Sequence, residues 1–323
     1  MKSIRISLIS SLFAAFILTG LVSCASLPEE SGYSTEMAVF NAISSSVQSI
    51  EKASETITPE EEYYIGRSVA ASIATTYPID QGSLQMTNYL NRICETLVMN
   101  SDKPYLYKGY YVVILDTDEI NAMATPGGHI FVSRGLIDCT DSEDALAAVL
   151  AHEISHVQLG HSVEAIKASR VRAAVSDTTK AVAVTSIATA NTRAGYSLSE
   201  KEMKKVMEAV NTFSDASNEV VKTLVNTGFS KEQEFEADKQ ALYIMQSAGY
   251  DPYAMLDMLG QLEESSSNSG WGATHPSPKD RIKKVEKELA AMKKSGSLIN
   301  QGKQVRTERF VSEYEEYRIF EID

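Results

Sequence analysis

The pentapeptide His152-Glu153-Ile154-Ser155-His156 constrains this chain more than any other feature of its sequence. Two histidines four residues apart lie on one face of an α-helix, so both imidazole rings can reach a single metal ion. Zinc suits two neutral imidazoles and lowers the pKa of water to about 7. The carboxylate of Glu153 is then placed to take a proton from that water. The motif therefore predicts zinc-dependent peptide hydrolysis, with Glu153 as general base and a third ligand elsewhere.

The segment around this motif has the pattern of one continuous helix. Thr140-Asp141-Ser142-Glu143 has the S/T-x-x-E form of a capping box, in which side chains satisfy backbone N–H groups of the first turn. Gly160 is a typical helix stop. Three of the five histidines fall within ten residues, which argues against an ordinary charged helix with incidental histidines. The apolar residues recur at helical spacing: Leu146, Val149, Leu150, Ile154 and Val157.

A second helix is predicted downstream, where a third ligand can be sought. Ser230-Lys231-Glu232-Gln233 looks like another capping box, and the helix runs to about Ser247 and stops at Gly249. Zinc hydrolases often use two histidines and one glutamate as ligands. The acidic residues of this helix are therefore the candidates.

The acidic residues of this second helix fall on different faces. Glu234 and Asp238 share one stripe, while Glu236 points away. Spacing favours Glu234 as the third ligand, and Glu232 remains a competitor because Glu232 and Glu236 are also one turn apart. A solvated acidic face without a ligand is the remaining alternative. Asp238 is placed to accept a hydrogen bond from the outer nitrogen of a ligand histidine.

Three short strands are predicted ahead of the metal helix: Tyr110–Leu115, Asn121–Ala124 and His129–Ser133. We expect an open strand edge beside the metal to bind an extended peptide through main-chain hydrogen bonds. A simple hairpin with a tight turn is the alternative. The glycines of the turn also let another backbone approach closely. The predicted substrate-binding residues are Gly127, Gly128, His129, Ile130 and Phe131.

In their order along the chain these motifs resemble the HtpX-like and type I CAAX-prenyl-protease family of zinc metallopeptidases (gluzincins), in its soluble periplasmic branch. The resemblance implies an α+β, mainly helical, zincin-like domain with a small β-sheet beside the active-site helix. It also implies that His152, His156 and Glu234 bind one Zn²⁺ ion per chain. The matching segments are Asn121–Gly128, Ile130 and Val132, Gly135–Ile137, His152–His156, His161, Glu234–Asp238, His275-Pro276 and Arg281-Ile282.

Three further residues have open roles. His275 follows a Ser/Asn/Gly-rich segment; it could stabilise the oxyanion of a tetrahedral intermediate, enter the fourth coordination position and hold the enzyme off, or only anchor its loop. The resemblance suggests that Arg281 packs toward the site, against Asp238 or Glu234. His161 lies past the helix stop, and we expect it to act as a cation that complements the helix dipole rather than as a ligand.

The N-terminus predicts export. Lys2 and Arg5 precede an apolar run over residues 6–18 that is typical of a secretory signal and too short to be trusted as a spanning helix. Leu21-Val22-Ser23-Cys24 resembles a bacterial lipoprotein signal, with cleavage before Cys24 and lipidation of its thiol. Ordinary cleavage to a soluble protein is the alternative. Ala25, which is not an aspartate, favours the periplasmic face of the outer membrane.

The rest of the chain divides by composition. Residues 162–229 are predicted to form a helical insertion that lids the cleft or docks partners. Their longest apolar stretch, near residues 181–190, is too short to span a membrane. The tail after the domain could add a strand, and the pairing of Cys94 with Cys139 is left open. The predicted boundaries are 1–23 for the signal peptide, 24–57 for a lipidated tether, 58–295 for the peptidase domain and 296–323 for the tail.

Charge and anchoring indicate the partners. Removing residues 1–23 leaves 300 residues and changes the net charge from -13 to -15, so nothing suggests nucleic acid. We expect unfolded or misassembled envelope proteins as substrates, a lipid anchor in the membrane, and envelope assembly partners. The alternative is an envelope chaperone or assembly factor whose metal site is gated and rarely cleaves. A processing enzyme for small peptides or prenylated proteins is a weaker possibility.

Overall fold

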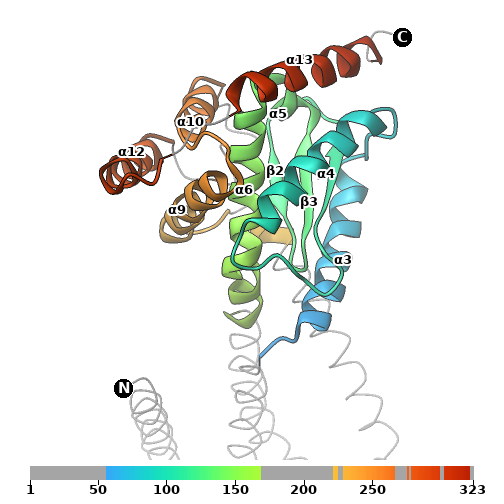
Figure 1. Cartoon of the computed structure of the whole chain (residues 1–323). Coiled ribbons are helices and arrows are strands. Elements are labelled where there is room, and N and C mark those ends of the chain that lie inside the picture. Colours follow the sequence, from blue (N-terminus) through green and yellow to red (C-terminus); the bar gives the residue numbers. More distant parts are fainter. Residues whose placement is uncertain are drawn as a thin grey trace, which may run out of the picture. The chain divides into compact units, whose positions relative to one another are not determined.

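In the computed structural model, the first two helices of the described residues precede the strands in the chain (Figure 1). Helix α3 (Pro59–Thr76) begins at Thr58, whose hydroxyl accepts a hydrogen bond from the Glu61 backbone while the Glu61 carboxylate accepts one from the Thr58 backbone. Helix α4 (Leu84–Met99) follows. The structure describes residues 56–168, 221–224, 228–265, 275, 278–298 and 302–320. The predicted signal, Cys24 and most of the 162–229 insertion lie outside these residues.

The sheet has three strands in the order β1-β3-β2. Strand β1 (Tyr111–Leu115) pairs in parallel with β3 (His129–Ser133), and β2 (Ala122–Ala124) pairs antiparallel with the other side of β3. Both edges of β3 are therefore occupied. Strand β2, rather than β3, is the edge strand that packs against the metal helix, and the binding of a peptide to such an edge stays a prediction.

The glycine turn between β2 and β3 serves the protein's own packing. Gly127 and Gly128 have φ angles of 76° and 93°, which favour glycine. A Cβ on Gly127 would lie 2.6 Å from the Cα of Tyr63 in α3, and one on Gly128 would lie 2.6 Å from the carbonyl oxygen of Gly109. The segments that come close to this turn are therefore α3 and the loop before β1.

Helix α6 (Glu143–Leu159) carries both motif histidines. It begins two residues later than predicted, because Ser142 rather than Thr140 caps it, with its hydroxyl accepting from the Ala145 backbone at 3.2 Å. Gly160 ends it in the left-handed conformation, as predicted. Every residue from Glu143 to Gln158 is buried, which is typical of a helix covered on all sides.

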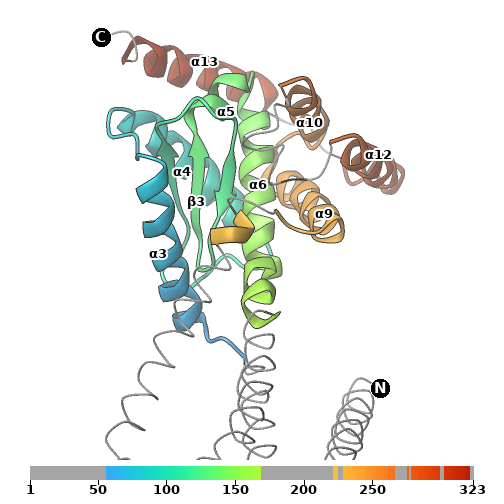
Figure 2. The ribbon, with the colours of Figure 1, turned by 180° about the vertical axis from the view of Figure 1, so that it is seen from behind.

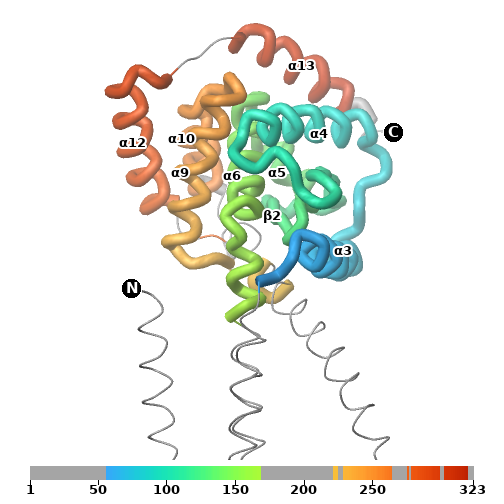
Figure 3. Tube along the Cα trace, turned by 60° about the horizontal axis from the view of Figure 1, so that its bottom comes forward, coloured from blue at the N-terminus to red at the C-terminus, as the bar shows by residue number. Residues whose placement is uncertain are grey.

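The covering elements around α6 come from both halves of the chain. Figure 2 shows the sheet on one side of α6 and α9 (Lys231–Ala248) on the other. The Ser230–Gln233 capping box predicted for α9 is present, and Gly249 ends the helix. Helices α10 (Ala254–Ser265) and α4 also pack on α6 (Figure 3). The short α5 (Arg134–Cys139) connects β3 toward α6.

The C-terminal tail is a helix, so the expectation that it adds a strand is wrong. Helix α13 (Lys303–Phe320) follows α12 (Pro278–Ser295) and packs against α4 and α6 (Figure 3). The Arg309 guanidinium donates to both carboxylate oxygens of Glu143, the first residue of α6. The hydroxyl of Tyr89 in α4 donates to the same carboxylate at 2.8 Å. The fold is thus mainly helical with a small sheet, as predicted.

Two further observations concern membranes and thiols. Among the helices of the described ranges, none combines the length and apolar character that crossing a membrane requires. The apolar stretch near residues 181–190 lies outside those ranges. Cys94 and Cys139 are both free thiols, and burial raises the pKa of Cys94 to about 12 and that of Cys139 to about 11.

Candidate metal centre

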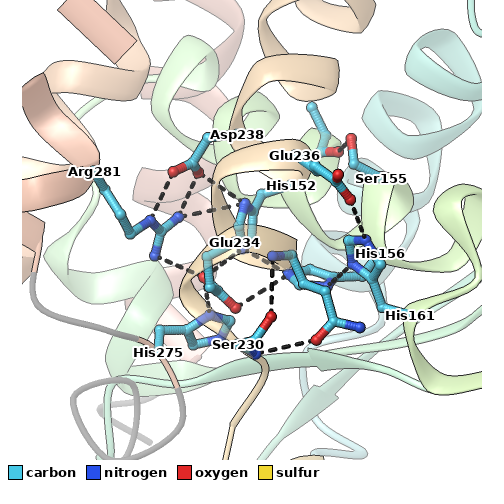
Figure 4. A network of polar contacts seen from close by, with 12 residues as sticks. His152, Ser155, His156, His161, Ser230, Glu234, Glu236, Asp238, His275 and Arg281 are labelled. Carbon is cyan, nitrogen blue, oxygen red and sulfur yellow. Dashed lines mark hydrogen bonds and ion pairs between the residues drawn. The ribbon is translucent and has the colours of Figure 1, made fainter. Parts of the chain in front are cut away.

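Helices α6 and α9 bring three predicted ligands to one point (Figure 4). The Nε2 atoms of His152 and His156 lie 3.1 Å apart. The carboxylate of Glu234 lies beside both rings, with Oε2 at 3.5 Å from Nε2 of His152 and Oε1 at 3.4 Å from Nε2 of His156. All three side chains are buried. The alternative ligand Glu232 is exposed on the first turn of α9.

The donor atoms fit a divalent cation. One ligand atom from each of His152, His156, Glu234 and His275 lies within 4.8 Å of the others. Among the described residues, no hydrogen bond reaches Oε1 of Glu234, although this atom is buried. A buried carboxylate oxygen is costly to leave without a partner, and a cation between these groups would supply one. Two imidazoles with one carboxylate are a donor set that zinc accepts.

Charge states in the centre also suit a cation. Burial alone raises the pKa of Glu234, but the neighbouring His275 and Arg281 outweigh it and hold this pKa well below 4.5. Burial lowers the pKa of His156 to about 3, so this ring is neutral. Burial and Arg281 also lower the pKa of His152, but hydrogen bonds to Asp238 and Glu234 prevail and raise it to about 9. A cation at Nε2 of His152 competes with that proton for one lone pair.

Asp238 and Arg281 form a buried pair behind His152. The carboxylate of Asp238 lies 3.0 Å from Nδ1 of His152, which is the outer nitrogen of that ring. The guanidinium of Arg281 donates twice to Asp238 and also lies 3.3 Å from Oε2 of Glu234. The sequence analysis expected Arg281 to pack against Asp238 or Glu234, and Arg281 contacts both. A carboxylate at this position orients the ring and sets its tautomer.

Glu153 lies beside the ligands and faces the sheet. Its side chain is buried, and Oε1 makes no hydrogen bond among the described residues. Burial raises the pKa of this carboxyl to about 7. A carboxylate with a raised pKa beside a metal centre is suited to accept and release a proton near neutral pH.

A small cavity opens beside Glu153. Part of its lining belongs to the predicted 162–229 insertion, of which only the last described residues reach the site. No predicted substrate-binding residue lines it: Ile130 and Phe131 are buried in the hydrophobic core, and the ring of His129 stacks on Tyr63 at 5.4 Å. The lining residues are Ala122, Met123, Glu153, Thr223, Leu224, Gly228, Phe229 and His275.

His275 joins the ligand group from outside α6 and α9. Its Nδ1 lies 2.8 Å from Oε2 of Glu234, and the residue is 8% exposed. The ring centre lies 5.4 Å from that of His152. In this arrangement His275 stands at the position from which a fourth donor would reach the centre.

The position of His161 was not predicted from the sequence. Its Nδ1 lies 2.8 Å from Nδ1 of His156, and burial lowers its pKa. The ring is buried against His156, and its lowered pKa disfavours the cation that was expected on the helix dipole. The ring of Phe229 stacks on His156 with centres 4.3 Å apart, a contact that no sequence spacing indicated. The closeness of His161 to the motif in the sequence was the signal that could have indicated its contact with His156.

The fold and the centre define a metallopeptidase. The sequence profile of peptidase family M48 matches residues 84–289, and the chain belongs to this family. This confirms the resemblance at the level of the family, while the HtpX-like and CAAX-prenyl-protease branch stays a prediction.

Three relatives illustrate the range of similar proteins. The chain is 26% identical to the beta-barrel assembly-enhancing protease of Yersinia pestis over 292 residues, which are 88% of this chain and 54% of that protein. It is 30% identical to the mitochondrial metalloendopeptidase OMA1 of Schizosaccharomyces pombe over 211 residues, 63% of this chain and 53% of that one. It is 27% identical to metalloprotease LoiP of Escherichia coli over 285 residues, 87% and 96% of the two chains. The chain thus spans about half the length of the first two.

Proposed function

We propose that this chain is a zinc-dependent metalloendopeptidase of the bacterial cell envelope that hydrolyses peptide bonds in unfolded or misassembled proteins. The observation that carries the proposal is the convergence of His152, His156 and Glu234 at one buried point, with the buried Glu153 carboxyl beside it. Membership of peptidase family M48 supports the reaction class.

The three ligand side chains would hold the cation, and each has a defined support. Bound zinc would supply Lewis acidity toward a carbonyl oxygen and lower the pKa of water. Asp238 holds the ring of His152, and Arg281 balances the charges of Asp238 and Glu234. These contacts keep the ligand atoms in place before substrate arrives, which reduces the reorganisation needed during the reaction.

Glu153 handles the proton. In its ionised form the carboxylate accepts a proton from the attacking water, and its burial keeps that proton from bulk solvent. The protonated carboxyl then donates to the leaving amine as the peptide bond breaks. The raised pKa of Glu153 suits both steps, because neither protonation state is strongly favoured near neutral pH.

Substrate would enter as an extended chain. The edge strand β2 borders Glu153, and its residues Ala122 and Met123 line the cavity. A peptide that adds to such an edge must have a free backbone, which folded proteins rarely offer. This requirement, together with the predicted lipid anchor at Cys24 and the relatives named as beta-barrel assembly-enhancing proteases, supports unfolded or misassembled envelope proteins as substrates.

A second function is supported by the position of His275. Its contact with Glu234 places an imidazole where it competes with water or substrate for the centre. With this ring held in place, the protein would bind envelope proteins and cleave rarely, as a chaperone or assembly factor. With the ring displaced, the same imidazole could donate to a developing oxyanion.

Cleavage of unfolded casein tests the proposal. The protein would start after Cys24, with zinc content measured, and Glu153→Gln and a chelator-treated sample would serve as controls. Internal cuts by the wild type that are lost in both controls support a zinc endopeptidase. Bound zinc without cleavage would favour the gated function, and His275→Ala should then release activity. Protein that binds no zinc would contradict the ligand assignment.

A further inference from the structure

The two ligand histidines are supported by different groups on their outer sides. The outer nitrogen of His152 faces the carboxylate of Asp238 at 3.0 Å. The outer nitrogen of His156 faces another ring, with its Nδ1 only 2.8 Å from Nδ1 of His161. Metal-binding histidines commonly donate this outer N–H to a carboxylate, a carbonyl or water. A histidine in that place needs its own explanation.

The shared contact fixes where the protons lie. Two ring nitrogens 2.8 Å apart form a hydrogen bond only if one donates and the other accepts. Since Nε2 of His156 faces Glu234 and His152, a cation there takes the Nε2 lone pair and the ring proton must sit on Nδ1. His161 then accepts at Nδ1, and as a neutral ring it carries its own proton at Nε2.

Glu236 stands at the far end of this line of contacts, which can be followed in Figure 4. Its carboxylate lies 3.6 Å from Nε2 of His161, close enough for electrostatic attraction but longer than an ordinary hydrogen bond. The side chain of Glu236 is 68% exposed, whereas that of His161 is 2% exposed. A carboxylate at this distance favours the tautomer of His161 that has its proton on Nε2.

Local structure holds the two rings together. Gly160, with a φ of 74°, turns the chain at the end of α6 so that His161 lies against the last turn rather than continuing away from it. The rings of His156 and His161 meet edge to face with centres 4.9 Å apart. Phe229 stacks on His156 and touches the ring of His161, which covers the pair.

We propose that His161 is a positioning residue that sets the tautomer and orientation of His156 for the metal, and that Glu236 sets the tautomer of His161. This inference rests on the proposed metal centre. It gives Glu236 a role, although the helix pattern placed this residue away from the ligand stripe. It also makes the two ligand rings unequal, since a charged carboxylate supports His152 while a neutral ring supports His156.

Zinc affinity tests the proposal directly. In the full chain, competition with a chromogenic chelator would give the dissociation constant of Zn²⁺ for each variant. We expect His161→Phe to weaken zinc binding about 10- to 100-fold, as is typical when such a support is lost. His161→Asn keeps an acceptor near the position of Nδ1 and should recover most of the affinity. Glu236→Gln should cause a smaller loss, and the exposed Glu232→Gln on the same helix none.

A second measurement guards against loss of fold. Thermal unfolding of the chelator-treated variants would show whether a change in affinity reflects misfolding. In addition, long-range ¹H–¹⁵N spectra of the zinc-loaded wild type resolve the tautomers of its five histidines, with His161 expected as the Nε2–H form and His156 as the Nδ1–H form. This readout does not depend on any variant.

The outcomes separate the two proposals. Wild-type zinc affinity retained by a folded His161→Phe, or an Nδ1–H tautomer at His161, would overturn the role of His161 and leave the metal centre intact. A wild type that binds no zinc would overturn the metal centre and, with it, this inference.

Discussion

Arg281 donates two hydrogen bonds to Asp238, from Nε at 2.8 Å and from Nη2 at 2.6 Å, with both side chains buried. The pair joins α12 to α9 directly behind the ligand His152. The pair links two helices and also supports the proposed ligand His152. These two effects can be measured separately.

Arg281→Met should destabilise the protein strongly. The substitution leaves the negative charge of Asp238 buried without its guanidinium, and removal of one partner from a buried pair typically costs about 3 to 5 kcal/mol. Urea unfolding in the presence of a chelator measures this loss apart from metal binding. Arg92→Met is the control, because Arg92 is a mostly exposed partner of Glu313, and should cost less than about 1 kcal/mol. Equal losses in the two variants would contradict the assignment.

The stability contributed by Asp238 should disappear only in strong acid. Burial raises the pKa of this carboxyl, but Arg281 and His152 outweigh that effect and lower it from 3.8 to about 2. The unfolded chain therefore binds this proton more readily, so the contribution is complete above the unfolded value and is lost as the pH falls through about 2. Asp238→Asn should flatten the acid side of the stability curve measured by urea unfolding. An unchanged curve would show that Asp238 is not ionised in the folded state.

Peptidase activity should fall on the acid side as Glu153 is protonated. Burial raises its pKa from 4.5 to about 7, and a bound cation lowers it because positive charge favours the carboxylate. The acid limb of kcat/KM should therefore have its midpoint between those two values. A profile on a fluorogenic peptide, with folding checked by circular dichroism at each pH, gives this midpoint. A limb below pH 4.5 would argue against Glu153 as the base.

Cleavage should favour small apolar side chains next to the scissile bond. The cavity beside Glu153 is lined mainly by apolar groups, among them Met123, Leu224 and Phe229. Leu224→Ala enlarges it and should admit larger side chains. A mass-spectrometric map of casein fragments from the two proteins would show the shift, with the exposed Val305→Ala as control. Cleavage without any preference in either protein would mean that this cavity does not hold substrate.

Removal of Arg309 should weaken the start of the metal helix. Glu143 is buried and receives hydrogen bonds from Arg309 and Tyr89. Arg309→Met leaves the hydroxyl of Tyr89 but removes the counter-charge, and we expect a loss of about 2 to 3 kcal/mol, since Arg309 is partly exposed. Glu315→Gln on the exposed side of α13 is the matched control. A loss no larger than that of the control would mean that α13 is only loosely attached.

Local patterns in the sequence were sufficient to predict most of the helices and the proposed metal ligands. The capping box at Ser230 and the stop at Gly249 bound α9 correctly, because caps and breakers act within one turn. At α6 the local pattern did not identify the correct cap. Thr140 and Ser142 are both good caps, and only the surrounding structure selects Ser142. Helical spacing placed Glu234 and Asp238 on the buried face and Glu236 on the exposed one.

Features that depend on distant pairing were not predictable in this way. The parallel pairing of β1 with β3 places the third strand in the centre of the sheet, and alternating residues within a strand do not encode its neighbours. The contact of His161 with His156 depends on how the chain turns at Gly160. The attachment of α13 depends on ion pairs between residues more than 160 positions apart.

The link between Glu143 and Arg309 has a consequence for how the molecule is assembled. The helix with both motif histidines begins at a carboxylate whose counter-charge lies 166 residues further along the chain. A chain that ends after α12 would contain every proposed ligand and Glu153, yet the first turn of α6 would lack its partner. The stability of the metal helix thus depends on α13, so a chain truncated after α12 would be disfavoured as an active peptidase.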